Sequence, residues 1–174
     1  FALLEHFGDI LELSPELSWN RRFLTEISYR PVTVLLSRRS FLPLEQWLEM
    51  ADLVACKGRA RVILLETGSR ASKGLSVDLQ TIIDAQRLSS YPLIVNCFAA
   101  AQNWSYVEQF AAAMIGAGVD GTQLQVEGDV LQSQPGADRT LYGDYFLPLT
   151  KRLQALRATL NATELMKRQG GSNR

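Results

Sequence analysis

The sequence predicts a parallel α/β fold, because short apolar runs alternate along the chain with segments of helical periodicity. The first four of five runs show little polar alternation, which is typical of strands covered on both faces. Their centres lie roughly 25–30 residues apart, close to the ~30 residues of a βαβ unit. We therefore expect parallel strands joined by right-handed crossovers. The five runs are Ile10–Leu13, Val32–Leu36, Val62–Leu65, Leu93–Val95 and Gly121–Val126.

Between the runs, apolar residues recur at helical spacing. Two clear stripes are predicted to form helices, one from Leu44 to Ala51 and one from Val107 to Met114. A longer stripe runs from Phe146 to Leu160, and weaker patterns cover Leu17 to Ile27 and Leu79 to Leu88. Strictly alternating units leave two architectures open, an open doubly wound sheet and part of a (β/α)8 barrel. A complete barrel typically needs ~250 residues, and this chain has 174.

Composition narrows the classes of partner and compartment. Lys and Arg total 18, Asp and Glu total 18, and the formal net charge is zero. This balance argues against a nucleic-acid or anionic-membrane partner, which needs a basic face. Two cysteines, Cys56 and Cys97, are too few for a disulfide framework and indicate a cytoplasmic setting. The sequence contains no run of about 18 apolar residues and therefore predicts no membrane span.

Polar residues follow the predicted strands, where parallel α/β folds carry their sites. They show no cluster with metal-ligand spacing and no Walker A, GxSxG or HExxH motif. From the residues alone, the sequence therefore predicts a metal-free polar cleft. The polar strand ends are Ser14-Pro15-Glu16, Ser37-Arg38-Arg39, Glu66-Thr67 with Arg70, Asn96-Cys97, and Gln123, Gln125 and Glu127.

Each reactive candidate has a structural alternative. The Arg38-Arg39 pair suits a phosphate, or a salt bridge to Glu66 or Glu16. Glu66 is a candidate general base, or one half of an ion pair. Cys97 is a candidate nucleophile, or a small buried core residue.

Other polar and aromatic positions have equally open roles. Gln123 and Gln125 alternate and would share the inner face of a barrel. Trp104 and Tyr106 either cap a pocket or pack at a helix start. His6 precedes the first strand and is expected to be solvated.

Five segments in order resemble the metal-dependent synthases that condense phosphoenolpyruvate with an aldose phosphate. These are the short-form 3-deoxy-heptulosonate 7-phosphate (DAHP) synthases and the 3-deoxy-octulosonate 8-phosphate synthases. The family's V-I-L-C-E-R-G-I-R is similar to Val62-Ile63-Leu64-Leu65-Glu66-Thr67-Gly68-Ser69-Arg70. The other segments are Asp9-Ile10-Leu11-Glu12-Leu13, Val34-Leu35-Leu36-Ser37-Arg38-Arg39 with Glu45-Gln46-Trp47-Leu48, Pro92-Leu93-Ile94-Val95-Asn96, and Gly118-Val119-Asp120-Gly121.

The resemblance implies a TIM-barrel-like fold corresponding to strands 4–8 of a (β/α)8 barrel. On this basis we expect a partial barrel over residues 1–160 and a polar, disordered tail over residues 161–174. A sheet of five such strands leaves two open edges. We therefore expect self-association, a second chain that completes the barrel, or a place within a longer product, in preference to the remaining alternative of a chain rebuilt as an open sheet.

The resemblance also implies that the metal site is lost. The family's cysteine, histidine, glutamate and aspartate ligands fall at Leu65, Ala99, Gln125 and near Gly136, with Asp138 a small shift away. Leucine and alanine offer no lone pair, and an amide is a poor replacement for a carboxylate. No metal or other cofactor is therefore expected.

The positions that bind phosphoenolpyruvate in the family have changed as well. Its lysine is Ser37 here, and two of its arginines are Glu16 and Thr67, whereas Arg38, Glu66, Gly68 and Arg70 match the family. We therefore predict no confident catalytic residue, with Arg38 and Glu66 as candidates. The expected ligand contacts are Arg38, Glu66, Arg70, Asn96 and Gln125.

These departures favour a non-catalytic relative of the DAHP synthases that binds a small polar metabolite or a protein partner. Two alternatives stay open. One is a metal-independent enzyme on the same barrel that uses Glu66, Arg38 and Cys97. The other is synthase chemistry completed by a partner chain.

Overall fold

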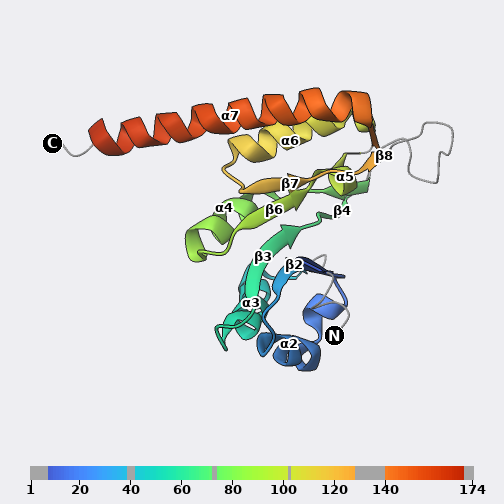
Figure 1. The fold of residues 1–174 in the computed structure, drawn as a ribbon, viewed down its shortest axis with the longest axis vertical. Coiled ribbons are helices and arrows are strands. Elements are labelled where there is room, and N and C mark those ends of the chain that lie inside the picture. The colour runs from blue at the N-terminus through green and yellow to red at the C-terminus, as the bar shows by residue number, and fades with distance from the viewer. Residues whose placement is uncertain (1–7, 39–41, 72–73, 102, 128–139, 171–174) are drawn as a thin grey trace.

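Five parallel strands form the central sheet of the computed structural model, which describes residues 8–38, 42–71, 74–101, 103–127 and 140–170. The sheet has the order β1-β2-β3-β6-β7, and each neighbouring pair is parallel (Figure 1). The predicted parallel α/β class is therefore confirmed. The strands are β1 (Ile10–Leu13), β2 (Thr33–Ser37), β3 (Arg61–Glu66), β6 (Leu93–Asn96) and β7 (Gly121–Gln123).

A helix connects each strand of this sheet to the next. The N-termini of two crossover helices are capped by side chains of the type that favours this position. Asn20 accepts a 3.1 Å hydrogen bond from the backbone of Phe23, and Asp78 accepts one of 3.0 Å from Gln80. The helices are η1 (Leu17–Trp19), α2 (Arg21–Ser28), α3 (Leu44–Ala55), α4 (Leu79–Leu88), α5 (Cys97–Ala100), η2 (Trp104–Tyr106), α6 (Val107–Gly116) and α7 (Gly143–Gly170).

The two faces of the sheet differ in chemistry. Successive side chains of a strand point to opposite faces, so the strand register assigns each residue to a face. One face carries a continuous buried row, Leu13, Leu36, Leu64 and Leu93, which belongs to the core shared with the helices. The opposite face, here called the inner face, carries the row Ser37, Leu65, Ile94 and Gly121.

Two details of the strands differ from the prediction. The fifth run was expected to be one strand to Val126, but β7 ends at Gln123 and Val126–Glu127 forms a separate strand, β8, paired with β9 (Leu141–Tyr142). The segment that follows β3, for which the sequence predicts no strand, forms a hairpin of β4 (Ser69–Ala71) and β5 (Gly74–Ser76). Strands of two or three residues are too short to show the alternation of apolar and polar residues by which a strand is recognised in a sequence.

The longest helix, α7, passes through residue 160, where the sequence suggested the end of the folded part. It packs against α6, and Leu149 and Leu153 on its inward side belong to the core. Residues 171–174 of the expected tail lie outside the described residues. None of the helices in the described ranges has an apolar stretch long enough to cross a lipid bilayer.

Within the described residues, β1 and β7 are the two edges of the five-stranded sheet. Each therefore presents backbone N–H and C=O groups that are not paired with another strand of that sheet. Figure 1 shows these edges at opposite ends of a curved sheet, with α7 lying beside β7. The open edges that the sequence implied are thus present in the described fold.

Candidate functional site

A chain of polar side chains crosses the inner face of the sheet near the carboxyl ends of the strands. The side-chain amide of Asn96, the last residue of β6, donates a 2.7 Å hydrogen bond to Oε1 of Gln123, the last residue of β7. Gln123 in turn donates a 2.9 Å hydrogen bond to the carboxylate of Glu12 on β1. These two hydrogen bonds therefore link the two edge strands of the sheet through their side chains.

Alternation along the strands explains why these side chains meet. Asn96 and Gln123 are register partners, so both point to the inner face. Glu12 is the partner of Leu35, which is in turn the partner of Ile63, and this row also lies on the inner face. Contact between side chains of the first and last strands requires the sheet to curve toward this face. In an eight-stranded barrel the interior is likewise filled by side chains that point inward from the strands.

A cavity of about 410 Å³ lies beside this polar chain, at the ends of β6 and β7. Three amides and three apolar residues line it: Asn96, Gln123 and Gln125, with Phe98, Leu124 and Val126. Its volume is in the range of small-molecule sites. The structure thus brings together two of the five predicted ligand contacts, Asn96 and Gln125, and adds Gln123, which was recognised in the sequence only as an inward-facing residue.

Arg38 and Glu66 form a buried ion pair. Arg38 also donates to the backbone carbonyl of Leu42 at 3.1 Å and to Ser69 at 3.3 Å. The other carboxylate oxygen of Glu66 accepts a 2.6 Å hydrogen bond from the backbone N–H of Gly68. Both charges are therefore neutralised and hydrogen-bonded within the protein, as the salt-bridge alternative from the sequence predicted.

The register also places this ion pair away from the inner face. Glu66 is the partner of Val95, and Val95 belongs to the helix-side core. Glu66 thus shares a face with Leu64, whereas Leu65 between them points inward. The structure therefore brings Arg38 and Glu66 together with each other, but not with Asn96 and Gln125.

The positions at which the resemblance expects metal ligands offer almost no donors. Leu65 is fully buried on the inner face, between Ser37 and Ile94 in the register. Ala99 lies in α5, where its backbone N–H donates a 2.8 Å hydrogen bond to Asn96. Gln125 contributes an exposed amide, and Gly136 and Asp138 lie outside the described residues. These side chains do not fit a divalent metal ion, since two of the three are aliphatic.

Cys97 is completely buried at the start of α5. Burial raises the pKa of its thiol to about 12, because a desolvated site disfavours the thiolate. A cysteine acts as a nucleophile or as a metal ligand in its thiolate form. Cys97 therefore behaves as a core residue, which weakens the metal-independent enzyme that would have used it.

The remaining candidates are dispersed. Arg70 lies in β4, and its side chain, like Arg39 and His6, falls outside the described residues. Trp104 packs edge-to-face against Tyr145 of α7, with ring centroids 5.8 Å apart. This contact corresponds to the packing role that the sequence offered for Trp104.

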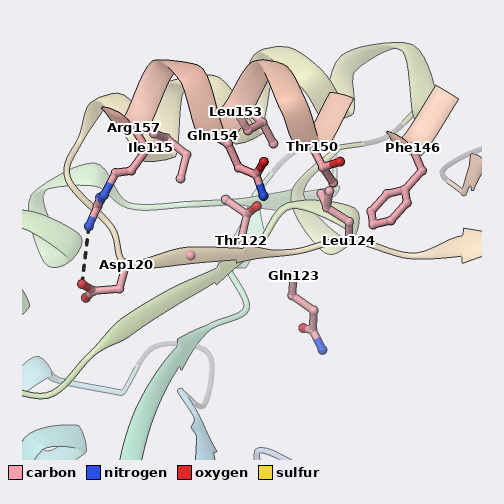
Figure 2. Close-up of a pocket in the computed structure, with 11 residues that line it drawn as sticks. Ile115, Asp120, Thr122, Gln123, Leu124, Phe146, Thr150, Leu153, Gln154 and Arg157 are labelled. Atoms are coloured by element: carbon pink, nitrogen blue, oxygen red, sulfur yellow. Dashed lines mark ion pairs between the residues drawn. The ribbon is translucent and has the colours of Figure 1, made fainter. Parts of the chain in front are cut away.

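A second and larger cavity, of about 510 Å³, lies between β7 and α7. Figure 2 shows Thr122 and Leu124 of this region pointing toward α7, whereas Gln123 points the other way. Leu153 and Phe146 face the cavity from α7, and Arg157 pairs with Asp120 at one end, at 3.6 Å. This cavity opens beside the unpaired edge of β7, on the face opposite the polar chain.

The chain is similar to DAHP synthases in both sequence and structure, although no family model matches it. It is 22% identical over 153 residues to the phospho-2-dehydro-3-deoxyheptonate aldolase of Thermotoga maritima, covering 86% of this chain and 45% of that protein. A truncated form of the 3-deoxy-D-arabino-heptulosonate 7-phosphate synthase of T. maritima superposes with a TM-score of 0.82 at 21% identity, over 90% of this chain and 61% of that chain.

A second solved structure gives the same result. The phospho-2-dehydro-3-deoxyheptonate aldolase (DAHP synthase) of T. maritima matches with a TM-score of 0.82 and 21% identity, over 90% of this chain and 47% of that chain. The chain thus spans about half the length of this structure and of the curated relative. Both comparisons point to DAHP synthase at low identity, and the chain has a DAHP synthase-like, TIM-barrel-related α/β fold.

Proposed function

We propose that this chain is a non-catalytic DAHP synthase-like module whose inner face binds a small polar metabolite. The observation that carries the proposal is Leu65, a fully buried aliphatic side chain on the inner face. By resemblance this is the position of the metal-binding cysteine. Ala99 and Gln125 stand at two further ligand positions, so the substitutions affect one site together.

The state of Arg38 supports the same proposal. A phosphorylated substrate needs cations that are free to pair with it. Arg38 is the matching arginine of the substrate site, and its guanidinium already contacts Glu66, Leu42 and Ser69. Freeing it for a ligand would leave the Glu66 carboxylate buried beside fewer partners, which costs about 3–5 kcal/mol for a buried pair.

Consumption of phosphoenolpyruvate in the presence of erythrose 4-phosphate and Mn²⁺ tests this proposal. The T. maritima aldolase assayed in parallel is the positive control. We expect no consumption above the protein-free rate, and metal analysis after dialysis should find no stoichiometric Mn, Fe or Zn. Turnover by the isolated chain, or a tightly held transition metal, would overturn the proposal.

A matched variant tests whether the altered positions account for the proposed loss of metal binding. The triple substitution Leu65→Cys, Ala99→His and Gln125→Glu places three metal donors at the positions that the resemblance indicates. We expect this variant to retain Zn²⁺ or Mn²⁺ through dialysis when the unaltered chain does not. Equal metal retention by both proteins would contradict the assignment of these positions.

A second candidate function is the binding of a protein chain at the sheet edges. The open edges of β1 and β7, and the cavity beside β7 with Leu124, Phe146 and Leu153, favour it (Figure 2). An added parallel strand could pair with β7 and place alternate apolar side chains beneath α7. Such a chain could complete the barrel, and the synthase chemistry of the whole assembly stays an alternative that the same consumption assay tests with the partner present.

A further inference from the structure

We infer that the cavity beside the Glu12–Gln123–Asn96 chain binds a neutral polyhydroxylated molecule, such as a sugar or a cyclitol, in preference to its phosphorylated form. This inference rests on the proposed function and specifies the chemistry of its ligand. It follows from three properties of the described residues around the cavity: their charge, their remaining hydrogen-bonding groups and their apolar surface.

The charge of the cavity opposes an anion. None of its six described lining residues is charged. The charged member of the Glu12–Gln123–Asn96 chain is Glu12, whose carboxylate accepts a 2.9 Å hydrogen bond from the Gln123 amide. Arg38, the arginine of the predicted site whose side chain is described, is buried in its pair with Glu66. A phosphate group would therefore approach a carboxylate, and none of the described residues that line the cavity supplies a compensating cation, which is unfavourable.

The hydrogen-bonding groups match hydroxyls. Each primary amide has two N–H donors and a carbonyl acceptor. Asn96 uses one donor on Gln123 and its carbonyl on Ala99, and Gln123 uses one donor on Glu12. Within the described residues, one N–H of Asn96, one N–H of Gln123 and the exposed amide of Gln125 make no hydrogen bond, and all three side chains line the cavity. A hydroxyl group both donates and accepts, so a polyol can satisfy both kinds of group at once.

The apolar part of the wall completes the match. Phe98, Leu124 and Val126 form the rest of the cavity lining. The carbon-bound face of a sugar or cyclitol ring is apolar and can pack on such a surface while the hydroxyls reach the amides. The volume of about 410 Å³ accommodates a molecule of monosaccharide size.

Matched pairs of probes test the inference on the chain as it exists. Saturation-transfer NMR and calorimetric titration would compare myo-inositol with myo-inositol 1-phosphate, and ribose with ribose 5-phosphate. We expect saturable binding of at least one neutral member, with Kd on the order of millimolar, and at least about tenfold weaker binding of its phosphorylated form. Tighter binding of the phosphorylated member, or no binding by either neutral probe, would overturn the inference.

Variants assign the binding to this cavity. Asn96→Ala and Gln125→Ala should each weaken binding of the neutral probe about five- to tenfold, since each removes ligand hydrogen bonds. Gln154→Ala removes an exposed amide of α7 that lines the other cavity, so this variant is the matched control and should leave Kd unchanged. Gln125 is exposed, so its variant stays informative if Asn96→Ala, which removes the cap of α5, does not fold.

A charge-introducing variant reverses the selectivity. Gln125→Arg should tighten binding of the phosphorylated probe at least fivefold and leave the neutral probe weaker than in the unaltered chain. No change in the ratio of the two affinities would contradict the placement of the ligand. The outcome is independent of the proposed lack of catalysis, because turnover of phosphoenolpyruvate would overturn the proposed function while leaving the measured preference unaffected.

Discussion

Gln123 and Glu12 are 111 residues apart in sequence and lie on opposite edges of the sheet, yet their side chains are joined by a 2.9 Å hydrogen bond. A flat five-stranded sheet would hold its edge strands far apart, since neighbouring strands are about 4.7–4.9 Å apart. The bond is therefore a direct measure of how strongly this sheet curves.

Removing the Gln123 amide should loosen this curvature. Gln123→Ala eliminates the hydrogen bonds to Glu12 and Asn96, each of which contributes about 0.5–1.5 kcal/mol. We expect the free energy of unfolding, measured by urea denaturation, to fall within that range per bond. Gln154→Ala removes an exposed amide from α7 and is the control with no expected change. Equal stability of the two variants would show that the polar chain does not contribute to the fold.

The Arg38–Glu66 pair predicts a strong dependence on both partners. Both side chains are almost fully buried. Arg38→Met leaves the Glu66 carboxylate without its charge partner, and Glu66→Met leaves the Arg38 guanidinium without its charge partner. Each single variant should lose about 3–5 kcal/mol of unfolding free energy.

The double variant Arg38→Met/Glu66→Met separates the interaction from the burial of each group. It should lose much less than the sum of the single variants, because no unpaired charge is left behind. Urea denaturation of all four proteins completes the cycle. Additive losses would mean that the two charges do not depend on each other.

Much of the fold follows from local patterns in the sequence. The run Val62–Leu65 marks β3 because continuous Val, Ile and Leu fit a strand covered by helices, and α3 appears where Leu44 and Trp47 begin a helical stripe. The end of β7 was missed because the pattern Thr122 to Val126 continues to alternate after the strand pairing stops. That boundary depends on the pairing of β8 with β9, a contact between residues about 15 apart.

The candidate site was only partly predictable. Asn96 and Gln125 are predicted ligand contacts because both lie at the carboxyl ends of predicted strands, and both line the same cavity. Arg38 and Glu66 also follow strands, but the register turns Glu66 toward the helix side, and a shift of one position reverses a side chain. Glu12 carried no signal of its own, since its contact with Gln123 exists only once the sheet is curved.

The two cysteines should differ sharply in reactivity. Cys56 is exposed, whereas Cys97 is buried and its pKa is raised to about 12 by burial. At pH 8, iodoacetamide should label Cys56 and leave Cys97 unmodified in the native protein, with both labelled in urea. Mass spectrometry of peptides gives the result, and Cys56→Ser is the control that should show no native labelling. Native labelling of Cys97 would revive it as a nucleophile.

The same thiol predicts a loss of stability at high pH. Its folded pKa lies above the ordinary value of 9.0, so the fold favours the protonated form. That contribution is fully present below pH 9 and is lost as the pH rises toward about 12. Cys97→Ala should therefore unfold with a weaker pH dependence than the unaltered chain between those values. Parallel curves for the two proteins would contradict the effect of burial.

The open edges predict self-association of the isolated chain. Ile10 on β1 is 55% exposed, and the cavity beside β7 presents Leu124 and Phe146. Long exposed edges with apolar neighbours promote pairing between chains. Light scattering should therefore show an average mass that rises with protein concentration. Ile10→Lys places a charge on β1, and Leu124→Glu places one directly after β7. Each variant should lower the average mass toward the value of one chain. Ala162→Glu adds a charge at an exposed position of α7, and this control should leave the average mass unchanged. A single-chain mass at all concentrations for the unaltered protein would mean that neither edge pairs with a second copy, and a fall in mass only with Leu124→Glu would assign the contact to β7 and the adjoining cavity.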